Sequence, residues 1–416
     1  MKKIRLGVMG IGRGVDLASA VMLAGAEIVA VCDFHKKRVE RARHKFDKGV
    51  AFYEDFDKFI EHPMDGVIVA NFFNEHAPYA IKCLERGIHV LSECISNGTM
   101  AEGVALIRAA SKSKAIYMLA ENYPFMKFNR EMKRVRESGA LGKVLYAEGE
   151  YNHPVDPMEI PFKKYFVYCP EHWRNYLPAT YYITHSLGPV MSSTGATPVR
   201  VTANAIYCPS EGAIPSASMR GDRAAIIMTQ NDDGSVFRVT GCSAFGGHEN
   251  SYRVAGTRGQ IENLRGMGNK VMLMINDWEL KEGEESVKCY EPEWNDKDED
   301  LIKQTGHGGA DYLTMRTFVE CIREGKQPDF PFDVHSAVTM SSVAILANRS
   351  MLEGGKPYDI PDFHKEEDLL AYENDYLTPF IGPNGEAPTV PCCSHPDYKY
   401  TDEQMQIYRK LILEEE

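Results

Sequence analysis

One stretch decides the fold of this chain: Ile4-Arg-Leu-Gly-Val-Met-Gly10-Ile-Gly12-Arg-Gly14. Its first six residues are largely apolar and predict a β-strand, and closely spaced glycines follow at once. Residues 16–24 then show the apolar spacing of a helix, and a second apolar run over 28–32 ends at Asp33. Strand, glycine turn, helix, strand and acid in this order predict a βαβ unit that binds a dinucleotide.

The residue types of this unit suit that chemistry. A turn that bends sharply and admits a pyrophosphate to its backbone requires glycine, which has no Cβ in the way. The phosphates would lie on free N–H groups at a helix N-terminus, where the helix dipole favours an anion. Asp33 would accept hydrogen bonds from the adenosine ribose and repel a 2′-phosphate, which favours NAD over NADP. The basic residues at 35–38 weaken that preference for NAD, because cations there could hold a phosphate. A plain tight turn is the alternative interpretation of the glycines, because Gly14 comes one residue before the usual third glycine.

The composition is that of a globular chain with two or three domains. It has 416 residues, of which 44% are hydrophobic and 25% charged. A net charge of −12 argues against nucleic acid or an anionic membrane as partner. No apolar run is as long as a membrane span, and the first strand begins too early to leave room for a signal peptide. The ten cysteines form no CxxC pair, so we expect reduced thiols and a cytoplasmic location.

Strands and helices alternate as far as residue 122, which predicts a Rossmann domain over 1–122. A further helix, expected over 334–352, would pack back on this domain. Ligands bind at the carboxyl ends of parallel strands in such sheets. Three of the expected strands end in polar side chains: Asn71, Glu93 and the pair Glu121-Asn122. We therefore expect these side chains to line one edge of a cleft.

The pattern changes over residues 123–333. A helix that ends near Arg136 is followed by β-rich runs, which hairpin signals such as Asp232-Asp233-Gly234 separate. The predicted fold class is α/β, with the N-terminal Rossmann domain joined to an α+β domain whose open sheet is largely antiparallel. Residues 363–416 are polar and rich in Pro, Asp and Tyr, and we expect them to form a C-terminal arm.

Four features carry a family likeness: a Rossmann unit, Glu93 at the end of the fifth strand, a β-rich second domain and a histidine on a helix of that domain. Over about residues 3–362 the chain resembles the Gfo/Idh/MocA oxidoreductases. Members of that family mostly oxidise or reduce a sugar hydroxyl with a nicotinamide. Their usual Glu-Lys-Pro is Glu93-Cys94-Ile95 here. The lysine that helps to move the hydroxyl proton in ordinary members is therefore absent.

Four further segments narrow the resemblance: Trp173-Arg174, Tyr182-Ile-Thr-His185-Ser-Leu-Gly-Pro189, Gly306-His-Gly-Gly-Ala-Asp311 and Lys356-Pro-Tyr-Asp-Ile-Pro-Asp362. They look like the NAD-dependent glycosidases of glycoside hydrolase family 109, which include α-N-acetylgalactosaminidases and also lack the lysine. The resemblance implies that Tyr182 and His185 are the catalytic pair. It also implies a redox route, in which transient oxidation at carbon 3 of the sugar permits elimination of the aglycone. Water addition and re-reduction then regenerate NAD.

That route needs a base whose pKa lies near neutrality, and histidine is the residue type that supplies one. Tyr182 precedes His185 by one helical turn, so both side chains could face the same sugar ring. Each candidate has a plainer alternative. His185 could be a packing or surface residue, and Trp173 could be core instead of a platform for a sugar ring. His307 and Asp311 could simply cap the helix that begins near Asp311.

The full set of expected site residues follows from these considerations. We expect the cofactor to contact Gly10, Ile11, Gly12, Arg13, Asp33, Asn71, His76, Glu93, Asn122 and Trp173. The substrate would contact Glu93, Tyr123, Arg174, Tyr182, His185 and His307. Glu93 could instead be only an acid near a helix N-terminus. His153, Asp156 and His172 lack the spacing of metal ligands, so we predict no metal.

The sequence thus predicts an NAD-dependent enzyme that acts on a small-molecule sugar or glycoside, with glycosidase chemistry as the first hypothesis. The alternatives are an ordinary sugar dehydrogenase or keto-sugar reductase, and a sugar-sensing homologue without turnover. We also expect a homo-oligomer, a dimer or a tetramer, in which the open face of the second sheet packs on another subunit. The β-rich runs from Val199 to Ile275 leave more apolar surface than one layer of helices would cover.

Overall fold

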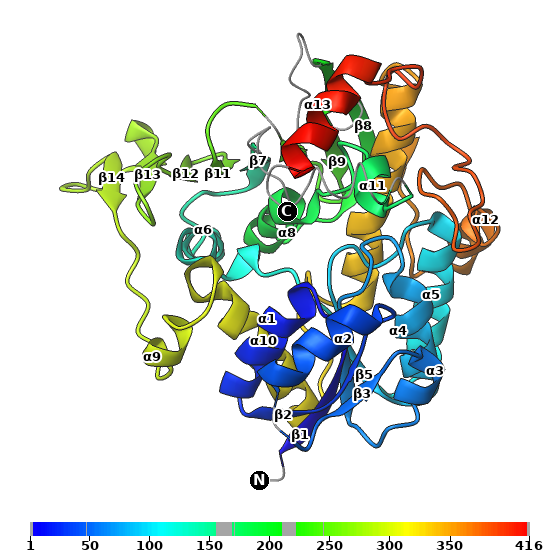
Figure 1. Ribbon diagram of the computed structural model, residues 1–416. Helices are drawn as coiled ribbons and strands as arrows, with labels where there is room; N and C mark the ends of the chain where they lie inside the picture. The colour runs from blue at the N-terminus through cyan, green and yellow to red at the C-terminus, as the bar shows by residue number, and fades with distance from the viewer. Residues whose placement is uncertain are drawn as a thin grey trace.

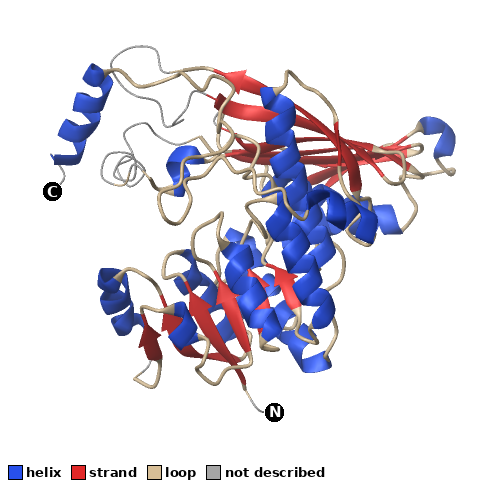
Figure 2. Cartoon of the chain, turned by 90° about the vertical axis from the view of Figure 1, so that its right-hand side faces the viewer, coloured by secondary structure: helices blue, strands red, loops and turns tan. Residues whose placement is uncertain are grey.

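The computed structural model describes residues 3–46, 48–154, 169, 171–209, 222–243 and 245–413. The chain folds into two domains, one above the other in Figures 1 and 2. The N-terminal domain lies below in both views, and the larger sheet of the second domain lies above it.

The N-terminal domain is a six-stranded parallel sheet with strand order β3-β2-β1-β4-β5-β6. The strands are β1 (Ile4–Met9), β2 (Ala26–Cys32), β3 (Ala51–Tyr53), β4 (Gly66–Val69), β5 (His89–Ser92) and β6 (Tyr117–Leu119). The helices between them are α1 (Arg13–Leu23), α2 (Lys36–Ala42), α3 (Phe56–Phe59), α4 (His76–Glu85) and α5 (Met100–Lys112). The predicted Rossmann fold is confirmed. β3 was not predicted, because three half-buried residues give no periodic signal.

The second domain contains a nine-stranded sheet with order β14-β13-β12-β11-β7-β10-β9-β8-β15. Its strands are β7 (Val144–Asn152), β8 (Pro198–Tyr207), β9 (Asp222–Asn231), β10 (Val236–Ser243), β11 (Glu249–Gly256), β12 (Gly259–Asn263), β13 (Val271–Ile275), β14 (Val287–Tyr290) and β15 (Tyr358–Asp359). All neighbouring strands are antiparallel except the pair β7–β10. The expected largely antiparallel sheet is confirmed.

Helices α6 (Lys127–Glu137), α8 (Thr184–Thr194) and α11 (Val334–Leu352) pack against this sheet. Figure 2 shows helices beneath the sheet, between it and the N-terminal domain. α11 also contacts α5 and β6 of the N-terminal domain. Because α11 contacts both domains, almost all of its side chains are buried. The expectation that 334–352 packs back on the Rossmann domain agrees with these contacts.

A second helix, α10 (Ala310–Glu324), also joins the domains. Met315, Phe318 and Val319 are buried in the same apolar cluster as β1 and α1. This helix lies inside the range predicted for the second domain, 123–333, yet it completes the core of the first. The apolar face of α10 would look the same in the sequence whichever domain it covered. The sequence alone therefore could not assign this helix to a domain.

The C-terminal arm begins after β15 and runs along the side of the N-terminal domain. Its helix α12 (Glu366–Tyr372) packs against α5, and Arg349 of α11 holds Asp375 of the arm at 2.6 Å. The arm ends in α13 (Asp402–Leu413), the red helix near the second domain in Figure 1. Within the described residues, none of the helices is both long and apolar enough to cross a membrane.

Candidate active site

The glycine turn forms a cradle that a larger residue would fill. Gly10 has φ +96, and a Cβ added there would lie 2.2 Å from the carbonyl oxygen of Ala70. A Cβ on Gly12 would meet nothing within 4 Å, so this position opens toward the cleft. Gly14 lies against β1, because its Cβ would come 2.8 Å from Val8. Gly14 therefore provides the close helix–strand packing of the third glycine, one residue before its usual place.

Helix α1 begins directly after this turn, with no side-chain cap on its N-terminus. Its first N–H groups and the positive end of its dipole are thus available to an anion. Asp33 closes the other side of the turn: its carboxylate accepts the N–H of Ile11 at 2.9 Å and of His35 at 2.8 Å. Each carboxylate oxygen has capacity for another hydrogen bond, such as one from a ribose hydroxyl. These features fit a dinucleotide.

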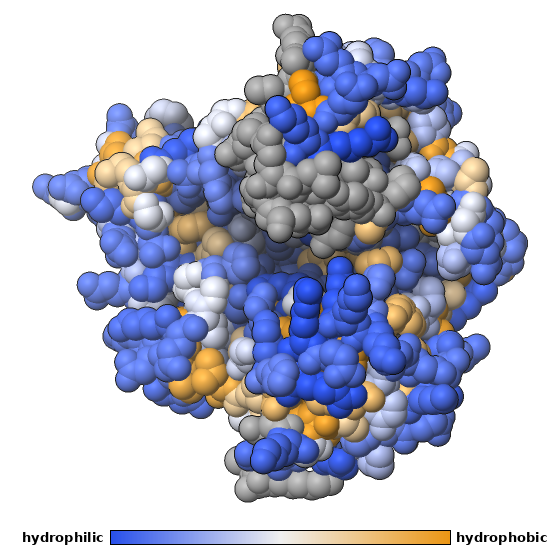
Figure 3. Space-filling view, in the orientation of Figure 1, coloured by the Kyte–Doolittle hydropathy of each residue, from blue (hydrophilic) through white to orange (hydrophobic). Residues whose placement is uncertain are grey.

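The turn opens into a cleft of about 230 Å³. Residues of both domains line it: Met9, Gly10, Gly12, Arg13, Asp33, Phe34, His35, Arg38, Ala70, Asn71, Phe72, Glu75, His172, Trp173 and Arg174. Of the ten residues expected to contact the cofactor, Gly10, Gly12, Arg13, Asp33, Asn71 and Trp173 are among them. Figure 3 shows the face of the molecule hollowed between the two domains, with hydrophilic side chains below the hollow.

His76 does not reach this cleft. Its side chain is buried, and Nδ1 lies 2.7 Å from the carbonyl oxygen of Ile95. The sequence predicts a contact of His76 with the cofactor, and the structure places its imidazole against the segment after β5. Burial lowers the pKa of His76, so the ring is neutral at physiological pH.

Trp173 lies on the short 3-10 helix Trp173–Tyr176 and joins the second domain to the first. Its ring stacks on Phe73, with centroids 5.2 Å apart, and Phe73 stacks on Tyr182 at 5.6 Å. The Arg174 guanidinium lies 4.4 Å from the centre of the Trp173 ring. Trp173 is thus part of an aromatic stack between the domains and also a wall of the cleft. Arg174, expected to contact substrate, lines the cofactor cleft instead.

A network of charges connects the glycine turn to α10. Arg13 contacts Glu93 at 3.4 Å and Asp311 at 2.6 Å. Asn122 donates to the same Asp311 oxygen at 2.7 Å, and Nδ1 of His307 lies 3.1 Å from the other. Burial by itself would raise the pKa of Asp311, but hydrogen bonds and charges from His307 and Arg13 hold it well below its usual range. Asp311 therefore stays ionised and joins four predicted site residues.

This geometry argues against helix capping as the role of His307 and Asp311, because the side chain that accepts an N–H in the first turn of α10 is that of Thr305, from Tyr312 at 3.2 Å. His307 also has φ +55, a left-handed conformation that is uncommon for any residue except glycine. Gly308 and Gly309 follow with φ of 63 and 90. The conformation turns the His307 ring toward Tyr123, at a centroid distance of 5.8 Å. Strained backbone of this kind is concentrated at functional sites.

The predicted base, His185, lies at the start of α8 against a buried carboxylate. Its Nδ1 is 2.9 Å and 3.0 Å from the two carboxylate oxygens of Glu121, which is fully buried at the end of β6. The Tyr123 N–H donates to Glu121 at 3.0 Å, and the Cys94 thiol lies 3.4 Å from its second oxygen. Burial would raise the pKa of Glu121, but the charge and hydrogen bond of His185 lower it below the usual value.

Aromatic rings hold the His185 ring in place. Tyr123 stacks on it with centroids 4.1 Å apart, and Tyr151 and Tyr182 present their edges at 5.0 Å and 5.2 Å. The Tyr252 hydroxyl donates to the His185 carbonyl oxygen at 2.5 Å. Tyr182 precedes α8 instead of lying on it, which corrects the expected shared helical face, but its ring still reaches His185. Only 11% of the His185 side chain is exposed.

Sequence reasoning placed Glu121 among the strand-end candidates but gave it no role. The signal that could have identified it is Gly188 in the segment Ser186-Leu187-Gly188-Pro189. A Cβ on Gly188 would lie 2.8 Å from Cγ of Glu121, so glycine is required for α8 to approach the carboxylate. A glycine inside a helix near the predicted base thus marks close contact with another segment.

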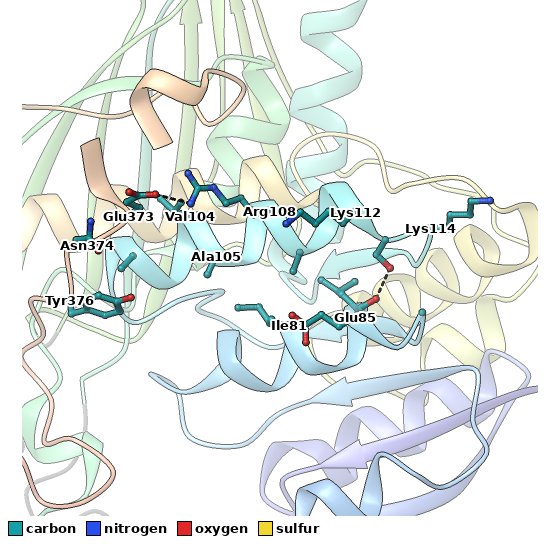
Figure 4. A pocket seen from close by; sticks show the side chains of 15 residues that line it. Ile81, Glu85, Val104, Ala105, Arg108, Lys112, Lys114, Glu373, Asn374 and Tyr376 are labelled. Carbon is teal, nitrogen blue, oxygen red and sulfur yellow. Dashed lines mark hydrogen bonds and ion pairs between the residues drawn. The ribbon is translucent and has the colours of Figure 1, made fainter. Parts of the chain in front are cut away.

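A larger hollow of about 800 Å³ lies elsewhere, between α4, α5 and the arm. Figure 4 shows its lining, in which Arg108 of α5 is held by Glu373 of the arm at 2.8 Å. None of the predicted site residues lines it. Among the residues that the structure describes, no group of three or more His, Cys, Asp or Glu side chains could hold a metal ion. Asp156 of the dismissed set lies outside the described residues.

Comparison with known proteins agrees with this geometry. Residues 4–121 match the family model for the oxidoreductase family, NAD-binding Rossmann fold, and residues 219–368 match the model for the glycosyl hydrolase 109 C-terminal domain. A glycosyl hydrolase family 109 protein of Saccharopolyspora erythraea is 27% identical, over 86% of this chain and 83% of the relative. A second one, from Akkermansia muciniphila, is 25% identical, over 87% and 83%.

Solved structures share the fold. Levoglucosan dehydrogenase in complex with NADH and L-sorbose superposes with a TM-score of 0.71 at 19% identity, over 87% of this chain and all of that one. The aldose–aldose oxidoreductase of Caulobacter crescentus superposes with a TM-score of 0.66 at 18% identity, over 86% of this chain and all of that one.

Fold and site together define an NAD-dependent enzyme of the oxidoreductase fold. Its N-terminal residues match the oxidoreductase family with the NAD-binding Rossmann fold, and residues 219–368 match the glycosyl hydrolase 109 C-terminal domain. The resemblance inferred from the sequence motifs is thereby confirmed.

Proposed function

We propose that this enzyme cleaves a glycoside by transient oxidation at carbon 3 of the sugar, elimination, water addition and re-reduction. The observation that carries the proposal is the buried Glu121–His185 pair, with Cys94 in the position of the missing lysine. When bound, NAD⁺ supplies the hydride acceptor for the oxidation. The relatives named as family 109 glycosyl hydrolases, which match most of the chain, support this reaction over simple dehydrogenation.

Different residues of the chain would bind the cofactor, remove the proton and orient the substrate. Gly10, Gly12 and the N-terminus of α1 would hold the pyrophosphate, and Asp33 the adenosine ribose. His185 would remove the proton next to the new ketone, since its Nδ1 edge is bound to Glu121 and Nε2 on the other edge is left for the substrate. Tyr182, whose ring contacts His185, and His307, whose ring lies near Tyr123, would contact sugar hydroxyls. Glu93, fixed by Arg13, would orient the sugar or the nicotinamide ribose.

The test is a panel of glycosides assayed for released aglycone, with free NADH followed in parallel. Redox-neutral cleavage predicts aglycone release without NADH accumulation, and in D₂O it places deuterium on carbon 2 of the product sugar. Steady NADH accumulation instead identifies a net dehydrogenase. The His185→Ala variant is the matched control. It should remove turnover from a glycosidase, whereas a sugar-sensing homologue would show no turnover even as wild-type protein.

A further inference from the structure

We propose that Glu121 is a positioning residue that fixes the tautomer of His185 and makes Nε2 the atom that exchanges the proton. The inference rests on the proposed role of His185 and deepens it. The two residues are 64 positions apart and come from different domains, since Glu121 follows β6 and His185 opens α8.

The hydrogen bonds around Glu121 determine the tautomer. An ionised carboxylate can only accept, so the His185 nitrogen 2.9 Å from it must carry a hydrogen. Burial would raise the pKa of Glu121, but besides His185 the Thr184 side chain and the Tyr123 N–H donate to the carboxylate and lower its pKa, which favours the ionised form. With hydrogen on Nδ1, the neutral imidazole has its lone pair on Nε2, on the opposite edge of the ring. Nε2 is then the basic atom.

The Cys94 thiol also contacts the carboxylate of Glu121, but as a neutral group it forms no ion pair with it. Burial, followed by the charges of Glu121 and Glu93, raises the pKa of the Cys94 thiol well above its usual value. The thiol therefore stays protonated and donates to Glu121 at 3.4 Å. A cation at position 94 would instead draw the carboxylate into an ion pair. With cysteine there, the charge of Glu121 acts mainly on His185.

The proton transfer balances with these groups alone. The proton leaves the sugar carbon next to the ketone and binds Nε2, while the C–H electron pair stays on the substrate. His185 becomes an imidazolium that keeps its Nδ1–H on Glu121, and the carboxylate takes no proton. The buried negative charge stabilises the imidazolium, and Tyr123 stacked at 4.1 Å keeps the ring from turning away.

Two substitutions separate charge from shape. Glu121→Gln keeps the shape and removes the charge; its carbonyl oxygen could still accept from Nδ1, but its amide N–H could now donate to Nδ1, so the Nδ1–H tautomer is no longer the only one that the neighbour permits. Glu121→Asp keeps the charge but shortens the side chain. We expect Glu121→Gln to lower turnover by about 10²–10⁴-fold, the range for a positioned base. Glu121→Asp should retain more activity. The buried Glu131, bound to Arg134 and Tyr290, provides the control Glu131→Gln, which should leave turnover unchanged.

The tautomer is measured directly by ¹⁵N NMR on enzyme with NAD and no substrate, using His185→Ala to assign the signal. Wild-type protein should show a protonated Nδ1 and a bare Nε2, and Glu121→Gln a larger share of the tautomer with hydrogen on Nε2. The proposal is overturned if Glu121→Gln keeps the wild-type tautomer, or if folded Glu121→Asp is less active than Glu121→Gln, as a purely structural role requires. The NMR result needs no turnover, so it stands even if no glycoside is cleaved, which would refute only the proposed function.

Discussion

At the scale of single residues, the rings of His185 and Tyr182 are in contact, with centroids 5.2 Å apart, and should act as a unit. Removal of the imidazole in His185→Ala should reduce turnover by about 10²–10⁴-fold, and Tyr182→Phe should cost less because its ring stays stacked on Phe73. In the double variant, loss of the hydroxyl should add little to the loss of the base, since effects within one catalytic unit are non-additive. Steady-state kinetics of the three variants measure this.

Thermal melts must accompany those kinetics. If both residues only packed the core, each substitution would lower the melting temperature, leave turnover per folded molecule nearly unchanged, and combine additively. NAD affinity, measured by calorimetry, should be the same in all three variants, because Gly10, Gly12 and Asp33 hold the cofactor on the other domain.

At the scale of secondary structure, the approach of α8 to β6 depends on Gly188. Gly188→Ala places a Cβ 2.8 Å from Glu121, which must shift or push the helix away. We expect a loss of about 1–3 kcal/mol in the free energy of unfolding, typical of overpacking, and a large loss of turnover from the displaced carboxylate. Gly49→Ala is the matched control, since a Cβ at Gly49 meets nothing within 4 Å. Chemical denaturation and kinetics on both variants test the prediction.

The ion pair between Arg13 of α1 and Asp311 of α10 should stabilise the fold less at acid pH. The folded-state pKa of Asp311 lies far below the unfolded value of about 3.9, so its stabilising effect is complete above that value. The effect is lost as pH falls from about 4 toward the folded pKa. Urea unfolding between pH 5 and pH 3 should therefore show a smaller decline for Asp311→Asn than for wild-type protein. If the free energy of unfolding declined equally with pH in the two proteins, the pKa of Asp311 would not be lowered in the folded state.

At the scale of the whole molecule, the exposed face of the second sheet is where we expect subunits to meet. Met228, Arg238, Glu148 and Arg253 lie side by side across β9, β10, β7 and β11, and Met228 is 45% exposed. The row alternates in charge beyond Met228, so it could pair with a second copy of itself. Light scattering at micromolar concentration should show a dimer or tetramer, and Met228→Glu should shift it toward monomer. Wild-type monomer alone would contradict the expectation.

Local spacing was enough to predict much of this protein. The glycine turn with Asp33 defined the cofactor-binding unit, because phosphate binding needs only a strand, a turn and a helix adjacent in the chain. The segment Tyr182–Pro189 identified His185 for a similar reason, since its residues are close in sequence. Alternating short runs likewise indicated the antiparallel sheet.

The contacts that complete the site join residues remote in sequence, and only the tertiary structure decided them. Glu121 meets His185 from 64 residues away, and Arg13 meets Asp311 from 298 away. No pattern within one segment records which side chain of another domain will lie against it. For the same reason, the sequence alone could not show that α10 packs on the N-terminal domain or that His76 contacts Ile95. Burial is a property of the folded chain, and here it leaves the carboxylate of Glu121 without access to solvent and in contact with His185.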